Sequence, residues 1–237
     1  MCDDLTDADN AGLSRRAFAL GASAVSLAAL LPSPANALTV ASRAVTIDTP
    51  DGPAQAFFAA PSTGRHPAVL VWPDARQKAM EWRKTLTPEA TTRDATAFVR
   101  WLDRQRGVDT RRGMAVTGYC MGGPMAFLTA VAFPGRVRAI GSFHGAGLVT
   151  DAPDSPHRLV PKTRASALIA IAQNDDARAP GDKDALRAAY DSARKHAEIA
   201  VYPANHGWCP PDSPAYDRDQ AERAWARLLV LLKEMPV

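Results

Sequence analysis

The sequence predicts an α/β fold, in which a mostly parallel sheet is flanked by helices. Three observations lead to this prediction. Short apolar runs alternate with helical segments along most of the chain. A glycine-rich turn stands between one of these runs and the helix that follows it. Polar residues follow two later runs at their carboxyl ends, where open α/β sheets carry their sites.

The first predicted elements form a hairpin. Residues 44–48 alternate between apolar and polar side chains, residues 50–52 are a turn signal, and residues 55–58 make the returning strand. The later apolar runs are predicted as buried strands at 69–72, 114–117, 139–143, 167–172 and 199–202. The helices between and after them are predicted at 93–106, 124–133, 183–196 and 218–233. No repeat or linker divides this series, so a single domain is expected over residues 38–237.

Composition excludes several classes of protein. The chain has 237 residues with 46% hydrophobic and 22% charged, which is ordinary for a globular protein and unlike a disordered one. Three cysteines are too few for a disulfide scaffold. The net charge is +3 and the basic residues are scattered, so no nucleic-acid partner is expected. No metal-ligand spacing such as CxxC or HExxH occurs, so no metal is expected.

Residues 1–37 have the features of a cleavable export signal. The pair Arg15-Arg16 precedes a mild apolar core at residues 17–31, and Ala-Asn-Ala at 35–37 fits a cleavage site before Leu38. Paired arginines in this position resemble a twin-arginine signal, which predicts a periplasmic or secreted protein. The alternative is a membrane anchor, but an apolar core of about 15 residues is shorter than the ~20 needed to span a bilayer.

The most informative segment is Gly118-Tyr119-Cys120-Met121-Gly122-Gly123, between a predicted strand and a predicted helix. Its G-x-C-x-G form is the cysteine version of a nucleophile elbow. The turn lifts Cys120 to the N-terminus of the helix, where the helix dipole favours thiolate. The backbone N–H of Met121 would face the oxygen that becomes negative during attack. The alternative is a buried structural cysteine in a glycine-rich turn.

Two further polar positions belong to the same predicted edge of the sheet. The strand at 167–172 leads into a segment with Asp175 and Asp176, and the strand at 199–202 leads into His206. A histidine there can take the thiol proton, and a carboxylate can fix its tautomer and orientation. Taken singly, Asp176 could cap a helix and His206 could be an ordinary surface histidine. Their joint placement after successive strands favours a shared site.

At these residues the chain resembles the dienelactone hydrolase family of α/β-hydrolases. The resemblance runs from about Leu38 to Leu232 and is carried by Gly118–Gly123, the Asp-x-x-x-Pro of Asp176–Pro180, and His206-Gly207. It implies a triad of Cys120, Asp176 and His206. It also implies hydrolysis of a lactone or small ester through a thioester, with no cofactor. Asp176 is chosen by its spacing to Pro180, and Asp175 remains a rival because the segment carries one extra residue.

The resemblance implies two more site residues after the strand at 69–72. Asp74 stands where the family has an acidic residue that can contact the thiol before substrate arrives. The backbone N–H of Ala75 would be the second donor to the oxyanion. Asp74 could equally be a turn residue after Pro73.

The chain departs from the family pattern between Asp74 and Cys120. Only 45 residues separate them, and no strand is recognisable there. Residues 77–86 look helical, and Thr87-Pro88 begins the next helix with an N-cap and a proline at the first position. The expected sheet therefore lacks one strand. It must either close the gap or leave backbone edges unpaired, and activity is expected to be weakened.

Several alternatives stay open at this point. The chain could be a binding protein of the same fold without activity, or a thiol redox protein that uses Cys120 and Cys209. A disulfide between those cysteines would silence the nucleophile, although the Cα separation that it requires is narrow. His144 is a second, weaker candidate for the base. A substrate carboxylate could bind an arginine at position 76, 83 or 178. The substrate and the oligomeric state are not predicted.

Overall fold

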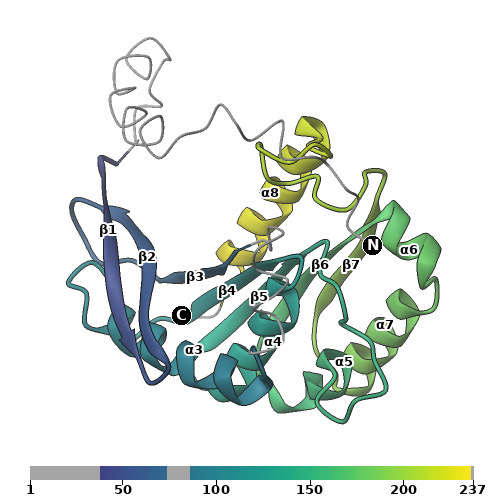
Figure 1. The fold of residues 1–237 in the computed structure, drawn as a ribbon, viewed down its shortest axis with the longest axis horizontal. Helices are drawn as coiled ribbons and strands as arrows, with labels where there is room; N and C mark the ends of the chain where they lie inside the picture. Colours follow the sequence, from purple (N-terminus) through teal and green to yellow (C-terminus); the bar gives the residue numbers. More distant parts are fainter. Residues whose placement is uncertain (1–37, 74–85, 236–237) are drawn as a thin grey trace. The chain divides into compact units, whose positions relative to one another are not determined.

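A computed structural model describes residues 38–73 and 86–235, and Figure 1 shows their arrangement. The strands are β1 (Val40–Thr49), β2 (Gly52–Pro61), β3 (Val69–Trp72), β4 (Met114–Tyr119), β5 (Val137–Phe143), β6 (Ser166–Ala172) and β7 (Ala197–Tyr202). The helices are α3 (Pro88–Asp103), α4 (Gly122–Ala132), α5 (Pro156–Leu159), η4 (Val160–Lys162), α6 (Gln173–Arg178), α7 (Asp182–Ser192) and α8 (Arg218–Lys233). This series confirms the predicted α/β fold.

Five of the strands form one parallel sheet. Their order is β3-β4-β5-β6-β7, which is also their order along the chain (Figure 1). β1 and β2 pair with each other in antiparallel fashion as a separate two-stranded sheet. Because the five strands are parallel, their carboxyl ends lie at a single edge, as the predicted site requires.

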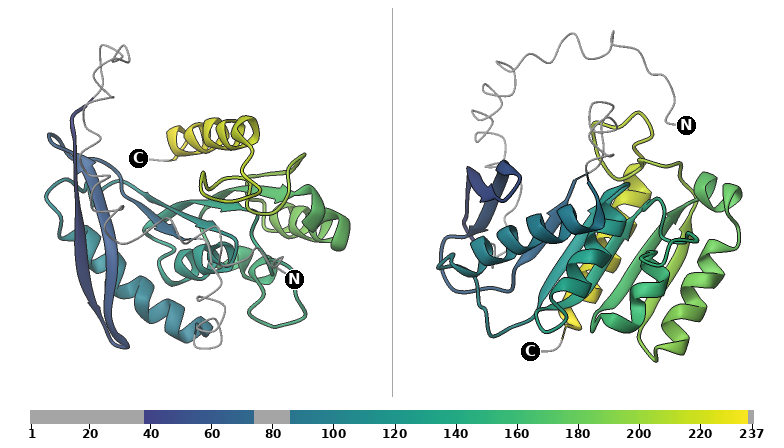
Figure 2. Two further views of the ribbon diagram at one scale, coloured as in Figure 1. Left: turned by 45° about the horizontal axis from the view of Figure 1, so that its top comes forward. Right: turned by 60° about the horizontal axis from the view of Figure 1, so that its bottom comes forward.

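Helices cover both faces of the parallel sheet (Figure 2). On one face, buried side chains of α3, α4 and α7 share a core with strand residues such as Val116, Ile140 and Ile169. On the other face, α8 supplies Ala224, Leu228 and Leu231, which pack on alternate strand residues. The middle strands β4, β5 and β6 therefore bury side chains on both sides, and this explains why they are continuous apolar runs in the sequence.

The sequence predicts that one strand of the sheet is missing, and β3 is the edge strand next to the place where it would lie. Within the described residues β3 pairs directly with β4, and none of the residues from 86 to 113 is in a strand. Val69 and Val71 of β3 are 40% and 55% exposed. The separate hairpin does not pair with this edge. Helix α3 begins where the sequence predicts, with Thr87 as its N-cap and Pro88 in its first turn.

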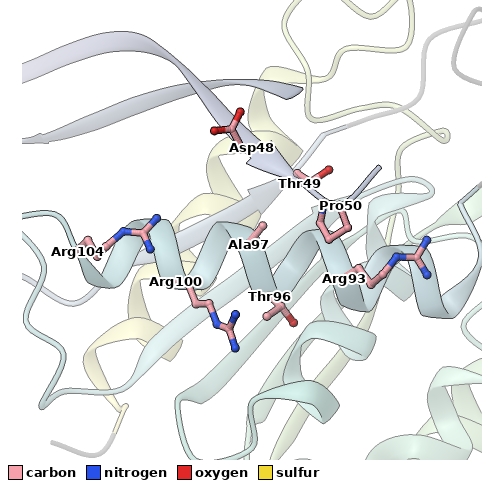
Figure 3. A pocket seen from close by; sticks show the side chains of 8 residues that line it. All are labelled: Asp48, Thr49, Pro50, Arg93, Thr96, Ala97, Arg100 and Arg104. Carbon is pink, nitrogen blue, oxygen red and sulfur yellow. The ribbon is translucent and has the colours of Figure 1, made fainter. Parts of the chain in front are cut away.

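The hairpin packs against α3 rather than against the parallel sheet. Phe58 of β2 meets Trp101 of α3 edge-on, with ring centroids 5.2 Å apart. Arg93 of α3 forms an ion pair with Asp51 in the turn at 2.7 Å. Between these elements lies an open groove of about 370 Å³, lined by three arginines and the hairpin turn (Figure 3). None of the predicted site residues lines it.

Some predictions concern residues outside the described ranges. These are the export signal at 1–37, Asp74, Ala75, the arginines at 76 and 83, and most of the helix expected at 77–86. In the part of the chain that is described, no helix is long and apolar enough to cross a membrane.

Candidate active site

Two glycines allow the turn that carries Cys120. A Cβ on Gly118 would lie 1.9 Å from the carbonyl oxygen of Gly122, and one on Gly122 would lie 2.9 Å from that of Trp72. Neither position can accept a side chain without backbone movement. Cys120 itself has a φ of 50°, in the left-handed region that is uncommon for residues other than glycine. The strand, strained turn and helix predicted from G-x-C-x-G are therefore present.

Backbone hydrogen bonds fix this turn against β5. The Cys120 N–H donates to the carbonyl of Phe143 at 3.1 Å. The Cys120 carbonyl accepts from Gly123 at 3.1 Å and from Ala146 at 3.2 Å. Met121 is the N-cap residue of α4, so Cys120 stands one residue before the N-terminus of an 11-residue helix. This position favours a negatively charged sulfur.

The acid that meets His206 is Asp175. His206 Nδ1 and Asp175 Oδ2 are 2.6 Å apart. Asp176 points elsewhere and forms an ion pair with Lys183 of α7 at 2.7 Å. The choice of Asp176 as the partner of His206 is thus wrong, and the rival that the sequence left open takes the position.

Local structure explains the difference. The choice of Asp176 assumed a loop measured back from Pro180, but residues 173–178 form the short helix α6 directly after β6. Successive helical residues are rotated by roughly 100° around the axis. Asp175 and Asp176 therefore project in different directions, one toward the loop after β7 and the other toward α7.

A set of hydrogen bonds ties the acid segment to the histidine loop. Asn174 Oδ1 accepts from the His206 N–H at 2.8 Å. The Gln173 side chain donates to Asn205 Oδ1 at 3.2 Å, and its backbone N–H donates to the Ala204 carbonyl at 3.0 Å. The sequence analysis missed these residues. They hold helix α6 and the loop after β7 at a fixed distance from each other. The only sequence signal for them was their adjacency to the acid and the histidine.

His206 is placed to carry a positive charge. Burial by itself would lower its pKa, but the hydrogen bond to Asp175 and the adjoining Cys120 thiol outweigh burial and raise the pKa to about 10. Since Nδ1 is bonded to Asp175, Nε2 is the nitrogen left to exchange a proton with the thiol. Cys120 is 9% exposed, so the pair is largely removed from water. Within the described residues, His206 Nε2 has no hydrogen-bond partner, so it is free to meet a substrate or a water molecule.

The other candidate base, His144, lies in the same cluster but has different properties. It is fully buried, and its ring packs edge-to-face on His206 with centroids 4.8 Å apart. Burial lowers its pKa to about 3, with a further lowering from the His206 charge. His144 therefore stays neutral at physiological pH.

Two other possibilities that the sequence raises, an arginine for a substrate carboxylate and a disulfide, can be compared with the structure. Arg178 forms an ion pair with Asp175 at 3.0 Å, so it is engaged with the acid. No disulfide joins Cys120 and Cys209, the two cysteines among the described residues. No cluster of three potential metal ligands occurs within residues 38–73 and 86–235.

The chain as a whole was compared with known proteins, and its sequence matches a family. The sequence model described as "Dienelactone hydrolase family" matches residues 70–236. A Yersinia pestis protein assigned as a carboxymethylenebutenolidase is 31% identical over 134 residues, which are 54% of this chain and 49% of that protein. The chain thus matches about half the length of that relative.

Solved structures show the same fold at lower identity. A protein of Klebsiella pneumoniae subsp. pneumoniae MGH 78578, assigned as a dienelactone hydrolase, has a TM-score of 0.70 at 20% identity, covering 83% of this chain and 99% of that one. The dienelactone hydrolase-like promiscuous phosphotriesterase P91, from metagenomic libraries, has a TM-score of 0.68 at 19% identity, covering 83% and 98%.

Proposed function

Because the chain belongs to the dienelactone hydrolase family, we propose that it hydrolyses a lactone or small carboxylic ester with Cys120 as the nucleophile. The observation that carries this proposal is the arrangement of the Cys120 thiol beside His206, whose Nδ1 lies 2.6 Å from Asp175 Oδ2. A nucleophile, a base and a group that orients the base are the parts that covalent acyl transfer needs.

In the first step the Cys120 thiolate attacks the carbonyl carbon of the ester. The carbonyl electrons move to oxygen and form a tetrahedral oxyanion. When this intermediate collapses, the C–O bond to the leaving group breaks and the His206 imidazolium gives its proton to the departing alkoxide. In a lactone this opens the ring. The products of the step are a Cys120 thioester, a hydroxyl group and a neutral His206.

In the second step water attacks the thioester carbon. His206 Nε2 removes a proton from that water, and Asp175 stabilises the imidazolium that forms. Collapse expels the Cys120 thiolate and releases a carboxylic acid. The resting thiolate–imidazolium pair is thereby restored, and one water molecule has been consumed.

Two backbone N–H groups complete the proposal by binding the oxyanion. The first is that of Met121, next to the nucleophile at the N-terminus of α4. The second is that of Ala75, which in the sequence follows shortly after β3, whose last residue Trp72 pairs with Gly118 of the elbow. Loss of one such donor costs about 10²–10³ in rate. Asp74, from the same segment, is proposed as a contact of the thiol before substrate binds.

The decisive experiment is a search for a covalent acyl-enzyme. Reduced full-length protein and its Cys120→Ala variant are mixed with a chromogenic small ester, and a small lactone is tested in parallel. The proposal predicts a burst equal to the enzyme concentration, a matching mass increase on the Cys120 peptide, and neither effect in the variant. Equal rates for both folded proteins would contradict it and favour a binding protein of this fold.

The two neighbouring carboxylates offer a matched pair of variants. Asp175→Asn should lower kcat by about 10²–10⁴, because His206 loses its orienting charge. Asp176→Asn should leave kcat within about threefold, since Asp176 pairs with Lys183 instead. Equal losses in the two variants would contradict the assignment of Asp175.

We further propose that residues 1–37 export the protein and that it acts outside the cytoplasm. The support is the sequence pattern of paired arginines, a short apolar core and a small-residue cleavage site. Fractionation of a bacterial host tests this, with Arg15→Lys/Arg16→Lys as the matched variant. Equal recovery of both proteins from the periplasm would contradict a twin-arginine route.

A further inference from the structure

We propose that His144 is a positioning residue. Its ring packs edge-to-face with the ring of His206 and holds that imidazole toward Cys120. This inference rests on the proposed function, because it assigns a role within the same site. His144 follows β5 directly, and its backbone N–H donates to the Ala170 carbonyl of β6 at 2.8 Å. Its φ is 40°, so the backbone adopts an uncommon conformation to place this side chain.

The ring of His144 is held by contacts rather than by hydrogen bonds. Its centroid lies 4.8 Å from His206, 5.1 Å from Trp208 and 6.0 Å from Tyr119. Neither Nδ1 nor Nε2 of His144 has a hydrogen-bond partner among the described residues. The side chain is 0% exposed. A neutral imidazole buried among three aromatic rings contacts them through its flat surface and its edge.

His206 needs such a support. Among the described residues its side chain has one hydrogen bond, through Nδ1 to Asp175. A ring held at one atom can still turn about that bond. Contact with His144 at an interplanar angle of 61° restricts this motion. Trp208 contacts the His144 ring as well, and Trp208 is itself stacked on Tyr202 with centroids 5.3 Å apart. An aromatic chain thus runs from β7 to the candidate base.

The charges around His144 are compatible with a positioning role for its ring and disfavour a role for His144 as the base. The titratable groups that face the His144 ring are His206, Asp175 on α6 and Tyr119 on β4. Cys120 adjoins His206, and Cys209 lies close to Tyr119. A second imidazolium here would repel His206. Burial keeps His144 neutral, as its lowered pKa indicates. It can therefore touch the charged base without competing for the thiolate.

The test separates the contribution of the flat ring at position 144 from that of its two nitrogens. His144→Phe keeps a flat ring and removes both nitrogens, whereas His144→Ala removes the ring. His144→Leu fills the space without a flat face and replaces the alanine variant if that does not fold. His196→Ala is the control, because this exposed histidine precedes β7 and so lies at the opposite end of that strand from His206. Ester turnover and the pH dependence of Cys120 alkylation, followed by peptide mass spectrometry, are measured on the full chain.

We expect His144→Phe and His196→Ala to stay within about threefold of the parent in kcat. His144→Ala and His144→Leu should lose about 10–100-fold in kcat with little change in KM, because the base is misplaced rather than the substrate. Their alkylation midpoint should move to higher pH, since His206 no longer stabilises the thiolate.

Two results would overturn the proposal. Parent-like kcat and alkylation in folded His144→Ala or His144→Leu would show that the ring positions nothing. A loss in His144→Phe as large as in His144→Ala would show that the nitrogens take part. Absence of any Cys120-dependent turnover in the parent would refute the hydrolase function instead, and the alkylation profiles would still decide the role of His144.

Discussion

Acid should destabilise this protein through His144, and replacing that residue with phenylalanine should remove the effect. The unfolded chain binds a proton at this histidine near its ordinary pKa of 6.5, but in the fold the pKa is lowered to about 3 by burial and by His206. Between these values the unfolded state binds more protons than the folded state. Stability is therefore full above pH 6.5 and is lost as pH falls toward 3.

The magnitude follows from the two pKa values. At pH 4 the unfolded histidine is almost fully protonated and the folded one almost fully neutral, which costs about 3 kcal/mol of folding free energy. At pH 7 the same cost is about 0.2 kcal/mol. The free-energy difference between His144→Phe and the parent should thus change by about 3 kcal/mol in favour of the variant between these pH values.

Urea unfolding of both proteins at pH 7 and pH 4 measures this double difference. Carboxylates that titrate over the same range contribute equally to parent and variant and cancel. His196→Ala, which removes an exposed histidine outside the site, is measured in parallel as the control. A value below about 1 kcal/mol for His144→Phe would refute the reasoning, since it would mean that the folded protein accepts a proton at His144.

Two further predictions concern the elbow and the loop that holds the base. Gly118→Ala should lower the free energy of unfolding by about 4 kcal/mol or more, or prevent folding, because its Cβ would overlap the Gly122 carbonyl. A Cβ at Gly135 meets no atom within 4 Å, so Gly135→Ala should change the melting temperature little. Similar melting temperatures for the two variants would contradict the close approach. Asn174→Ala should cost about 1–3 kcal/mol of stability and lower kcat, because the His206 N–H loses its acceptor; unchanged kcat with lost stability would restrict Asn174 to a structural role.

The elements that the sequence predicts best are those in which local pattern and tertiary environment agree. β6 and β7 are apolar runs that remain strands because both faces of the sheet are covered. Thr87 and Pro88 mark the start of α3 as capping chemistry requires. The elbow around Cys120 was predictable because only glycine fits at Gly118 and Gly122.

The carboxylate that contacts His206 was less predictable, because it depends on the direction in which each side chain points rather than on sequence spacing. Asp175 and Asp176 are adjacent and chemically identical, so a one-residue error in the local structure exchanges their roles. Spacing counted back from Pro180 treats the segment as a loop, whereas residues Gln173–Arg178 form the short helix α6 directly after β6. Which carboxylate meets His206 was then decided by the position of the loop after β7 and by Lys183 on α7.

The sequence alone determined the α/β class, the order of strands and helices, the cysteine elbow and the histidine at the same edge of the sheet. These features depend on hydrophobic periodicity and on the small size of glycine, which are local properties of the chain. Only the tertiary structure decided that Asp175 contacts the His206 ring, that Asn174 accepts from the His206 backbone N–H, and that the buried His144 packs against that ring. These contacts join residues about 30 to 60 positions apart in the chain, so their geometry depends on how the strands align rather than on any local pattern.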